Sequence, residues 1–134
     1  MPLFYSCVLL IFSCLTSLAQ SNIDSVDYKY GGGFTGMTTT YRLTPKKIYQ
    51  ANGIIPLVFS DVRKMKKSTW KKIYAAAKNV LNIQSPINSP SNEYQSIIIY
   101  AGAVKSTYTW SVNNQVNVPN LSSLVQLVKN ASIK

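Results

Sequence analysis

Residues 68–81, STWKKIYAAAKNVL, carry the clearest periodic pattern of this 134-residue chain. Their apolar residues recur every three or four positions, which is the spacing of one face of an α-helix. The stripe consists of Trp70, Ile73, Tyr74, Ala77, Val80 and Leu81. Ser68 is suited to cap the first turn, and Ser85-Pro86 stops a helix because the residue before proline avoids the α region. We therefore predict a helix over 68–81 with one buried face.

The residues before this helix are strand-like. Val26, Tyr28 and Tyr30 alternate with polar residues, which is the period of a β-strand. Residues 37–43 are rich in Thr and Tyr and favour a second strand. The glycines of residues 31–36 separate the two, so we predict a hairpin with a glycine-rich turn or bulge.

A third, short strand is predicted over residues 47–51, ended by a turn at Asn52-Gly53. Residues 54–59 are apolar but contain Pro56, and their pattern indicates neither strand nor helix. Residues 61–67 are basic and are expected to lead into the helix.

The residues after the helix repeat the same kinds of signal. Residues 85–92, rich in Pro, Ser and Asn, predict a loop. Residues 94–100 contain three consecutive isoleucines, which favour a strand buried on both faces. Residues 104–112 alternate, with Tyr108 and Trp110 on one face, and residues 115–118 suggest a last short strand. Pro119 suits the first position of a terminal helix with an apolar stripe of Leu and Val.

The order is three strands, a helix, two or three strands and a helix. Helices separated from runs of antiparallel strands indicate the α+β class. We predict a single domain over residues 20–134. Its small antiparallel sheet should have about five strands, in the element order β-β-β-α-β-β-α. We expect the two helices to cover one face of the sheet.

Residues 1–19 predict a cleaved signal peptide. They contain no charged side chain, and their apolar run is shorter than the roughly 20 residues that span a bilayer. Ser17 and Ala19 are small residues at the third and first positions before a cut, so we place the cut after Ala19, which predicts a secreted or periplasmic protein. Two alternatives are an uncleaved anchor and a lipoprotein lipidated at Cys14. Both cysteines, Cys7 and Cys14, lie in this segment, so the remaining domain has none.

The groups that the chain lacks restrict its chemistry. There is no histidine, and without cysteine in the domain neither imidazole nor thiolate chemistry is available to it. Four acids remain, and we interpret them as solvated or turn-forming: Asp24, Asp27, Asp61 and Glu93. We therefore expect no catalytic residues, no metal site and no cofactor, and we predict that the protein is not an enzyme.

The chain is strongly basic, with 14 Lys and Arg against 4 acids and a net charge of +10. This excess favours contact with an anionic polymer or lipid surface, although solubility alone is the other interpretation. The densest cluster of candidate residues is Arg63, Lys64, Lys66, Lys67, Lys71 and Lys72. The nearby aromatics Trp70 and Tyr74 lie on the apolar stripe, so we do not expect nucleic acid as the partner.

The glycine-rich segment also suggests a binding role. No Gly-Lys-Ser or Gly-Lys-Thr follows it, so it lacks the phosphate-binding pattern of a P-loop. The sequence YGGGFTGM at residues 30–37 resembles the Gly-Gly-Phe-x-Gly-hydrophobic signature of the emfourin family, small bacterial inhibitors of thermolysin-like metalloproteases. The later order of helix, strands, Pro119 and terminal helix is similar to that family as well.

The resemblance implies an exported inhibitor whose partner is a protein, a secreted metalloprotease in particular. The contact would lie at Gly31, Gly32, Gly33, Phe34, Thr35 and Gly36, with Phe34 as an apolar anchor. The alternative for Phe34 is a buried side chain beside a structural bulge. The competing hypothesis for the whole protein is a basic envelope protein that binds an anionic polymer or lipid surface.

Overall fold

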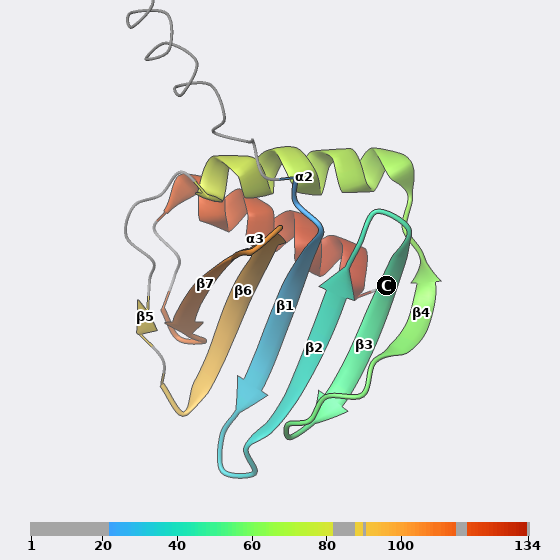
Figure 1. The fold of residues 1–134 in the computed structure, drawn as a ribbon. Coiled ribbons are helices and arrows are strands. Elements are labelled where there is room, and N and C mark those ends of the chain that lie inside the picture. Colours follow the sequence, from blue (N-terminus) through green and yellow to red (C-terminus); the bar gives the residue numbers. More distant parts are fainter. Residues whose placement is uncertain (1–21, 82–87, 90, 115–117, 134) are drawn as a thin grey trace, which may run out of the picture.

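The computed structural model describes residues 22–81, 88–89, 91–114 and 118–133. These residues form one seven-stranded sheet and two helices, and both helices cover the same face of the sheet (Figure 1). In the described part of the chain the opposite face carries no helix. The predicted α+β class is confirmed, although the sheet has more strands than the five expected.

Four strands lie between Ser25 and the start of α2 (Lys67–Leu81), and they pair antiparallel with one another in sequence order. They are β1 (Ser25–Gly32), β2 (Met37–Leu43), β3 (Lys47–Gly53) and β4 (Ser60–Lys64). The hairpin of β1 and β2 is the predicted one. The predicted turn at Asn52-Gly53 is wrong, because both residues still pair with β2 and the chain turns only after Gly53.

The sequence pattern does not predict β4. Residues 61–67 were expected to lead directly into the helix, but residues 60–64 first pair with β3 across a register shift between Ile48 and Tyr49. Arg63 is half-buried and every other residue of β4 is exposed. Apolar and polar residues alternate along a strand when one of its faces is buried. No residue of β4 is fully buried, so its sequence lacks this period-two pattern.

Three strands follow α2 (Lys67–Leu81). They are β5 (Asn88–Ser89), β6 (Glu93–Ala101) and β7 (Val104–Ser111). The long strand β6 pairs with β1, so the order across the sheet is β4-β3-β2-β1-β6-β7-β5. All pairs are antiparallel except the short parallel pair of β5 with β7. β5 lies within residues 85–92, which were predicted to be loop throughout.

The three isoleucines of β6 do not share one environment. Ile97 and Ile99 are fully buried beneath the helices, but Ile98 points to the opposite face and is half-buried. The prediction of burial on both faces is therefore wrong for Ile98, because the helices cover one face only.

The helices bury the predicted apolar stripes. α2 begins at Lys67, one residue before the predicted cap, and Ser68 lies inside its first turn. α3 (Pro119–Ser132) begins with Pro119 at the predicted first position. The buried residues of α2 are Trp70, Ile73, Ala77 and Val80, and those of α3 include Leu121, Leu124, Val125 and Val128. They pack with the sheet residues into one hydrophobic core.

Some predictions lie outside the described residues. These are the signal peptide over 1–19 with the cut after Ala19, the lipidation alternative at Cys14, and residues 115–117 of the strand predicted over 115–118. Val118 is described and directly precedes α3.

Candidate functional site

Two neighbouring loops extend from the same end of the sheet (Figure 1). One joins β1 to β2 and the other joins β3 to β4. β2 pairs with both β1 and β3, and the Thr38 hydroxyl donates a hydrogen bond of 2.9 Å to the Gly53 carbonyl oxygen beside the bases of the two loops. We call residues 33–37 and 54–59 together the loop end.

The loop end exposes large apolar side chains. Phe34 has an exposed fraction of 109%, so the alternative of a buried Phe34 is wrong. Four more side chains there are more than half exposed: Met37, Ile54, Ile55 and Val58. No residue of the loop end is charged. Exposed apolar groups of this kind are found at protein interfaces, at membrane contacts and in ligand-binding grooves.

The glycines of the hairpin divide into two groups. Gly31 and Gly32 belong to β1, where each has a positive φ. A Cβ on Gly31 would lie 2.3 Å from the Met37 carbonyl oxygen, and one on Gly32 would lie 2.2 Å from the Asn92 carbonyl oxygen. These two glycines therefore let three backbone segments come close together. They build the hairpin rather than form its tip.

The other four predicted contact residues form the tip. They are Gly33, Phe34, Thr35 and Gly36. Gly36 donates its backbone N–H to the Gly33 carbonyl oxygen at 3.3 Å, and Met37 donates its N–H to the Thr35 hydroxyl oxygen at 3.4 Å. The Gly33 N–H is bound to the Asn92 carbonyl oxygen. These bonds hold Phe34 outward at the apex of the turn.

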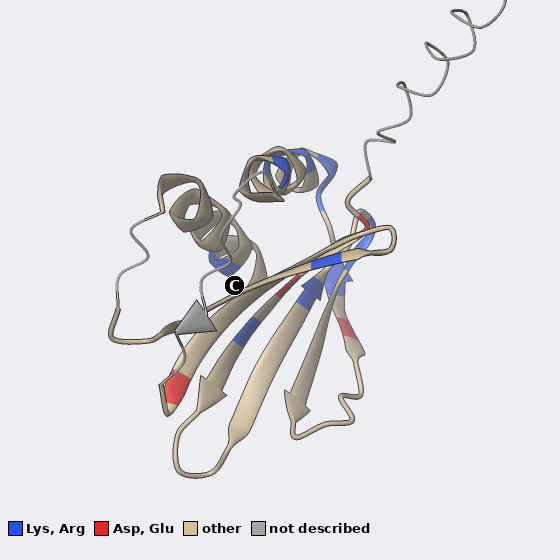
Figure 2. Ribbon diagram, turned by 60° about the vertical axis from the view of Figure 1, so that its left-hand side comes forward, with Lys and Arg blue, Asp and Glu red and all other residues tan. Residues whose placement is uncertain are grey.

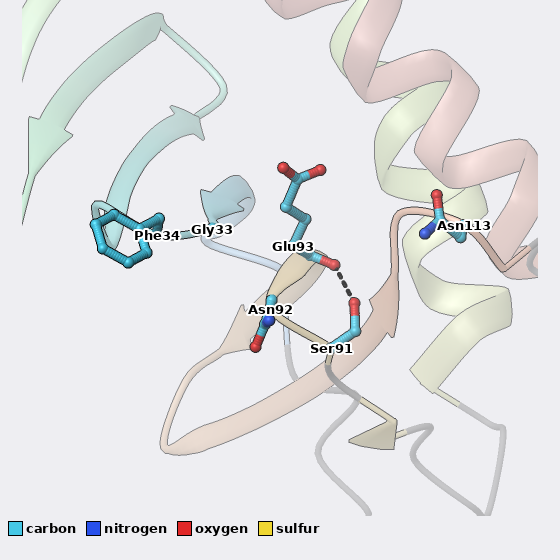
Figure 3. Close-up of a pocket in the computed structure, with 6 residues that line it drawn as sticks. All are labelled: Gly33, Phe34, Ser91, Asn92, Glu93 and Asn113. Atoms are coloured by element: carbon cyan, nitrogen blue, oxygen red, sulfur yellow. Dashed lines mark hydrogen bonds between the residues drawn. The ribbon is translucent and has the colours of Figure 1, made fainter.

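A wide depression adjoins the tip (Figure 3). It has a volume of about 950 Å³ and is lined by Gly33, Phe34, Ser91, Asn92, Glu93 and Asn113. Phe34 and Asn113 lie at its two sides, with Glu93 and Asn92 between them. The Ser91 hydroxyl donates a 2.6 Å hydrogen bond to the Glu93 carbonyl oxygen. The depression therefore offers amide, hydroxyl and carboxylate groups beside the apolar loop end.

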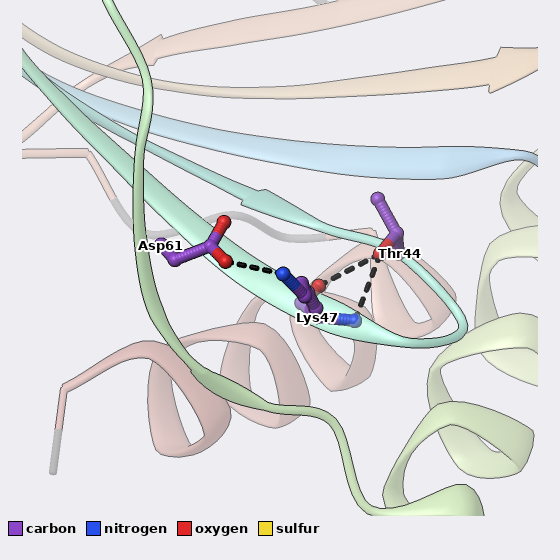
Figure 4. Close-up of polar contacts among 3 residues, drawn as sticks. All are labelled: Thr44, Lys47 and Asp61. Carbon is purple, nitrogen blue, oxygen red and sulfur yellow. Dashed lines mark hydrogen bonds and ion pairs between the residues drawn. The ribbon is translucent and has the colours of Figure 1, made fainter.

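The acids have different environments. Asp24 accepts a hydrogen bond of 2.8 Å from the backbone N–H of Gly102, as expected of a turn-forming acid. Asp61 is exposed and forms an ion pair with Lys47, whose N–H and carbonyl oxygen are bound by the Thr44 hydroxyl (Figure 4). The interpretation of Asp27 as a solvated or turn-forming acid is wrong, because its exposed fraction is 2%.

Asp27 lies on the sheet face opposite the helices and binds Arg42 of the neighbouring strand through two hydrogen bonds of 2.8 and 2.7 Å. The Arg42 guanidinium lies 4.4 Å from the centre of the Phe59 ring and 5.3 Å from that of Tyr100. The hydrogen bonds to Asp27 raise the pKa of the Arg42 guanidinium. The stacked ring of Phe59 ties the loop of residues 54–59 to the sheet.

The six predicted basic residues separate in the structure. Arg63, Lys64, Lys66 and Lys72 line one cavity of about 640 Å³ between β4 and the two helices. Lys67 and Lys71 are exposed on α2 and do not line it. Figure 2 shows Lys and Arg along α2 and the adjoining strand ends, with others on α3 and within the sheet, whereas residues 33–37 and 54–59 contain none. The prediction that Trp70 lies in the core is confirmed, since its exposed fraction is 9%.

Sequence reasoning missed the second loop as part of the site. Ile54, Ile55 and Val58 have exposed fractions of 69%, 79% and 82%, and the cis peptide bond Ile55–Pro56 lies among them. The signal that could have found them was present. An apolar run that fits neither a strand nor a helix is a candidate exposed apolar loop.

The described residues contain neither a cluster of metal-binding side chains nor a helix that could span a membrane. No three or more acidic, histidine or cysteine side chains come together there as ligands for a metal ion. No helix among those residues has the length and apolar character needed to cross a membrane.

Neither the protein-family models nor the curated proteins compared with this chain gave a match. The resemblance of residues 30–37 to the emfourin signature therefore stays a prediction.

Proposed function

We propose that this is an exported, non-enzymatic binding protein that docks on another protein through the loop end. The observation that carries the proposal is the uncharged set of five exposed apolar side chains on two adjacent loops and the first residue of β2. Burial of Phe34 and its neighbours would supply the hydrophobic centre of an interface, and the polar depression beside it would supply the rim.

The anchoring of the loops supports this role. A contact surface held before binding loses little conformational entropy when the partner arrives. Backbone bonds from Gly33 and Gly36 hold the first loop, and the stacking of Phe59 on Arg42 holds the second. The loop end is therefore suited to fill a cleft of a partner protein.

For the partner we propose a thermolysin-like metalloprotease, on the strength of the resemblance at residues 30–37. The test titrates such a protease with the purified protein at physiological and at high salt and measures residual activity. We expect the residual activity to fall linearly and level off at one molecule of this protein per protease molecule. The inhibition should persist at high salt, because the loop end carries no charge.

The variant Phe34→Ala is expected to weaken inhibition at least tenfold, about 1.4 kcal/mol. The matched control is Val104→Ala, which removes an exposed apolar side chain at the start of β7 and should leave inhibition unchanged. Absence of inhibition by the unmodified protein would contradict the proposed target. Equal effects of the two variants would contradict the loop end as the contact surface.

A further inference from the structure

A cavity at the other end of β3 and β4 is separate from the loop end. It has a volume of about 640 Å³ and lies where the end of β4, the start of α2 and the end of α3 meet. None of its lining residues belongs to the loop end. The guanidinium of Arg63 donates a hydrogen bond to the carbonyl oxygen of Ala131, which joins β4 to the last turn of α3.

The lining of the cavity combines two kinds of surface. Four apolar side chains belong to the lining, from β3, the connection between β4 and α2, α3 and the residue after α3: Ile48, Met65, Leu127 and Ile133. Three exposed ammonium groups belong to the same lining: Lys64, Lys66 and Lys72. None of the lining residues that the structure describes is acidic. The cavity is therefore apolar in part and strongly positive at its lysines.

We propose that this cavity binds a small anionic amphiphile, a single molecule with a phosphate or carboxylate head and an alkyl chain. Its volume is within the roughly 300–1,000 Å³ of small-molecule sites. The lysines would pair with the head group while their own alkyl stems extend the apolar wall. The chain would cover Leu127 and Ile133.

Each half of the ligand is required by a different part of the lining. A neutral apolar molecule would remove water from the three ammonium groups without pairing them, which is unfavourable. A small hydrophilic anion would leave the apolar part of the cavity uncovered and gain only weak, screened attraction. A free amphiphile fits both parts, and the recessed position between two helices and a strand favours a single molecule over a bilayer surface.

The first experiment uses decyl phosphate, below its micelle concentration, in isothermal titration calorimetry with the purified protein. We expect saturable binding of one molecule. Inorganic phosphate alone is expected to bind at least tenfold more weakly, and decyltrimethylammonium, which has the same chain and the opposite charge, is expected not to bind. Equal binding of all three probes, or no binding of decyl phosphate, would overturn the proposal.

Two pairs of variants test the placement. Lys72→Gln is expected to weaken decyl phosphate binding about threefold to fivefold, the size of one exposed ion pair, whereas Lys71→Gln on the same turn should have no effect. Ile133→Ser should weaken binding, and Val104→Ser should not. All four side chains are exposed, so the variants should fold, and their melting temperatures would verify this.

Two outcomes would contradict a built site. Equal weakening by Lys71→Gln and Lys72→Gln would indicate a general attraction of the basic surface. Competition of phosphatidylglycerol vesicles with decyl phosphate would indicate a membrane lipid in place of a free amphiphile. Neither outcome depends on protease inhibition, so this proposal and the proposed function fail separately.

Discussion

At the scale of single residues, Asp27 has the least expected environment. Its sequence position near the start of the first strand indicates a solvated acid, but its carboxylate is buried against Arg42 of β2. A charge with an exposed fraction of only 2% needs a partner, and the guanidinium provides one in a two-bond geometry. The rings of Phe59 and Tyr100 beside the guanidinium fix its position.

The first prediction concerns this pair. Asp27→Ala should lower the free energy of unfolding by about 2 kcal/mol, because it removes two charge-assisted hydrogen bonds and leaves Arg42 without its acceptor. Urea denaturation at neutral pH measures the change. The control is Lys47→Gln, which breaks the exposed pair with Asp61 and should leave the midpoint unchanged. An equal change in both variants would show that the burial of Asp27 contributes nothing.

At the scale of the element, the β1–β2 hairpin depends on close backbone approach. Gly31 and Gly32 lie against the backbone of Met37 and Asn92, whereas Gly36 at the tip has open space around a Cβ position. All three have positive φ, so an alanine at any of them is strained. The two strand positions add a steric clash to that strain.

The second prediction compares these glycines. Gly31→Ala should destabilise the protein by more than about 3 kcal/mol, the sum of backbone strain and overpacking. Gly36→Ala should cost about 1 kcal/mol, since only the left-handed backbone conformation opposes it. Thermal or urea unfolding gives the difference. A Gly36→Ala variant as unstable as Gly31→Ala would contradict the distinction between strand and tip.

At the scale of the whole molecule, the two helices cover one face of the sheet. Asp27 and Arg42 lie on the opposite face, whereas Tyr28 lies on the covered face. Tyr28 lies beneath α3 on the covered face with its ring centre 5.6 Å from that of Tyr30 and 5.6 Å from the Lys129 ammonium. Burial, with the neighbouring phenols Tyr30 and Tyr41, raises the pKa of Tyr28 to about 12.

The third prediction follows from that pKa. The unfolded chain releases the Tyr28 proton at a pH of about 10, but the folded protein holds it to about 12. The contribution to stability is therefore complete below pH 10 and is lost as the pH rises from 10 to 12. In the variant Tyr28→Phe, the free energy of unfolding should decline less steeply over this pH range than in the unmodified protein. Urea denaturation at several pH values measures this free energy. An unchanged decline would contradict the assignment.

The local sequence determined several features of this protein. The two helices follow from stripes at three- and four-residue spacing, and Pro119 marks the start of the second. The hairpin follows from alternation before the glycine run and from the Thr- and Tyr-rich residues after it. All of these signals depend on neighbours within a few residues. They were enough to predict the α+β class and the glycine-rich half of the candidate site.

Tertiary structure alone decided the rest. β4 forms by pairing with the free edge of β3, and its own residues do not alternate between apolar and polar. Asp27 is buried because pairing brings Arg42 opposite it, 15 residues away in the chain. The exposure of Phe34 and its proximity to the second loop, and the cavity between β4 and the helix ends, likewise depend on how distant segments pack. Register and packing join residues far apart in sequence, which a pattern of near neighbours does not encode.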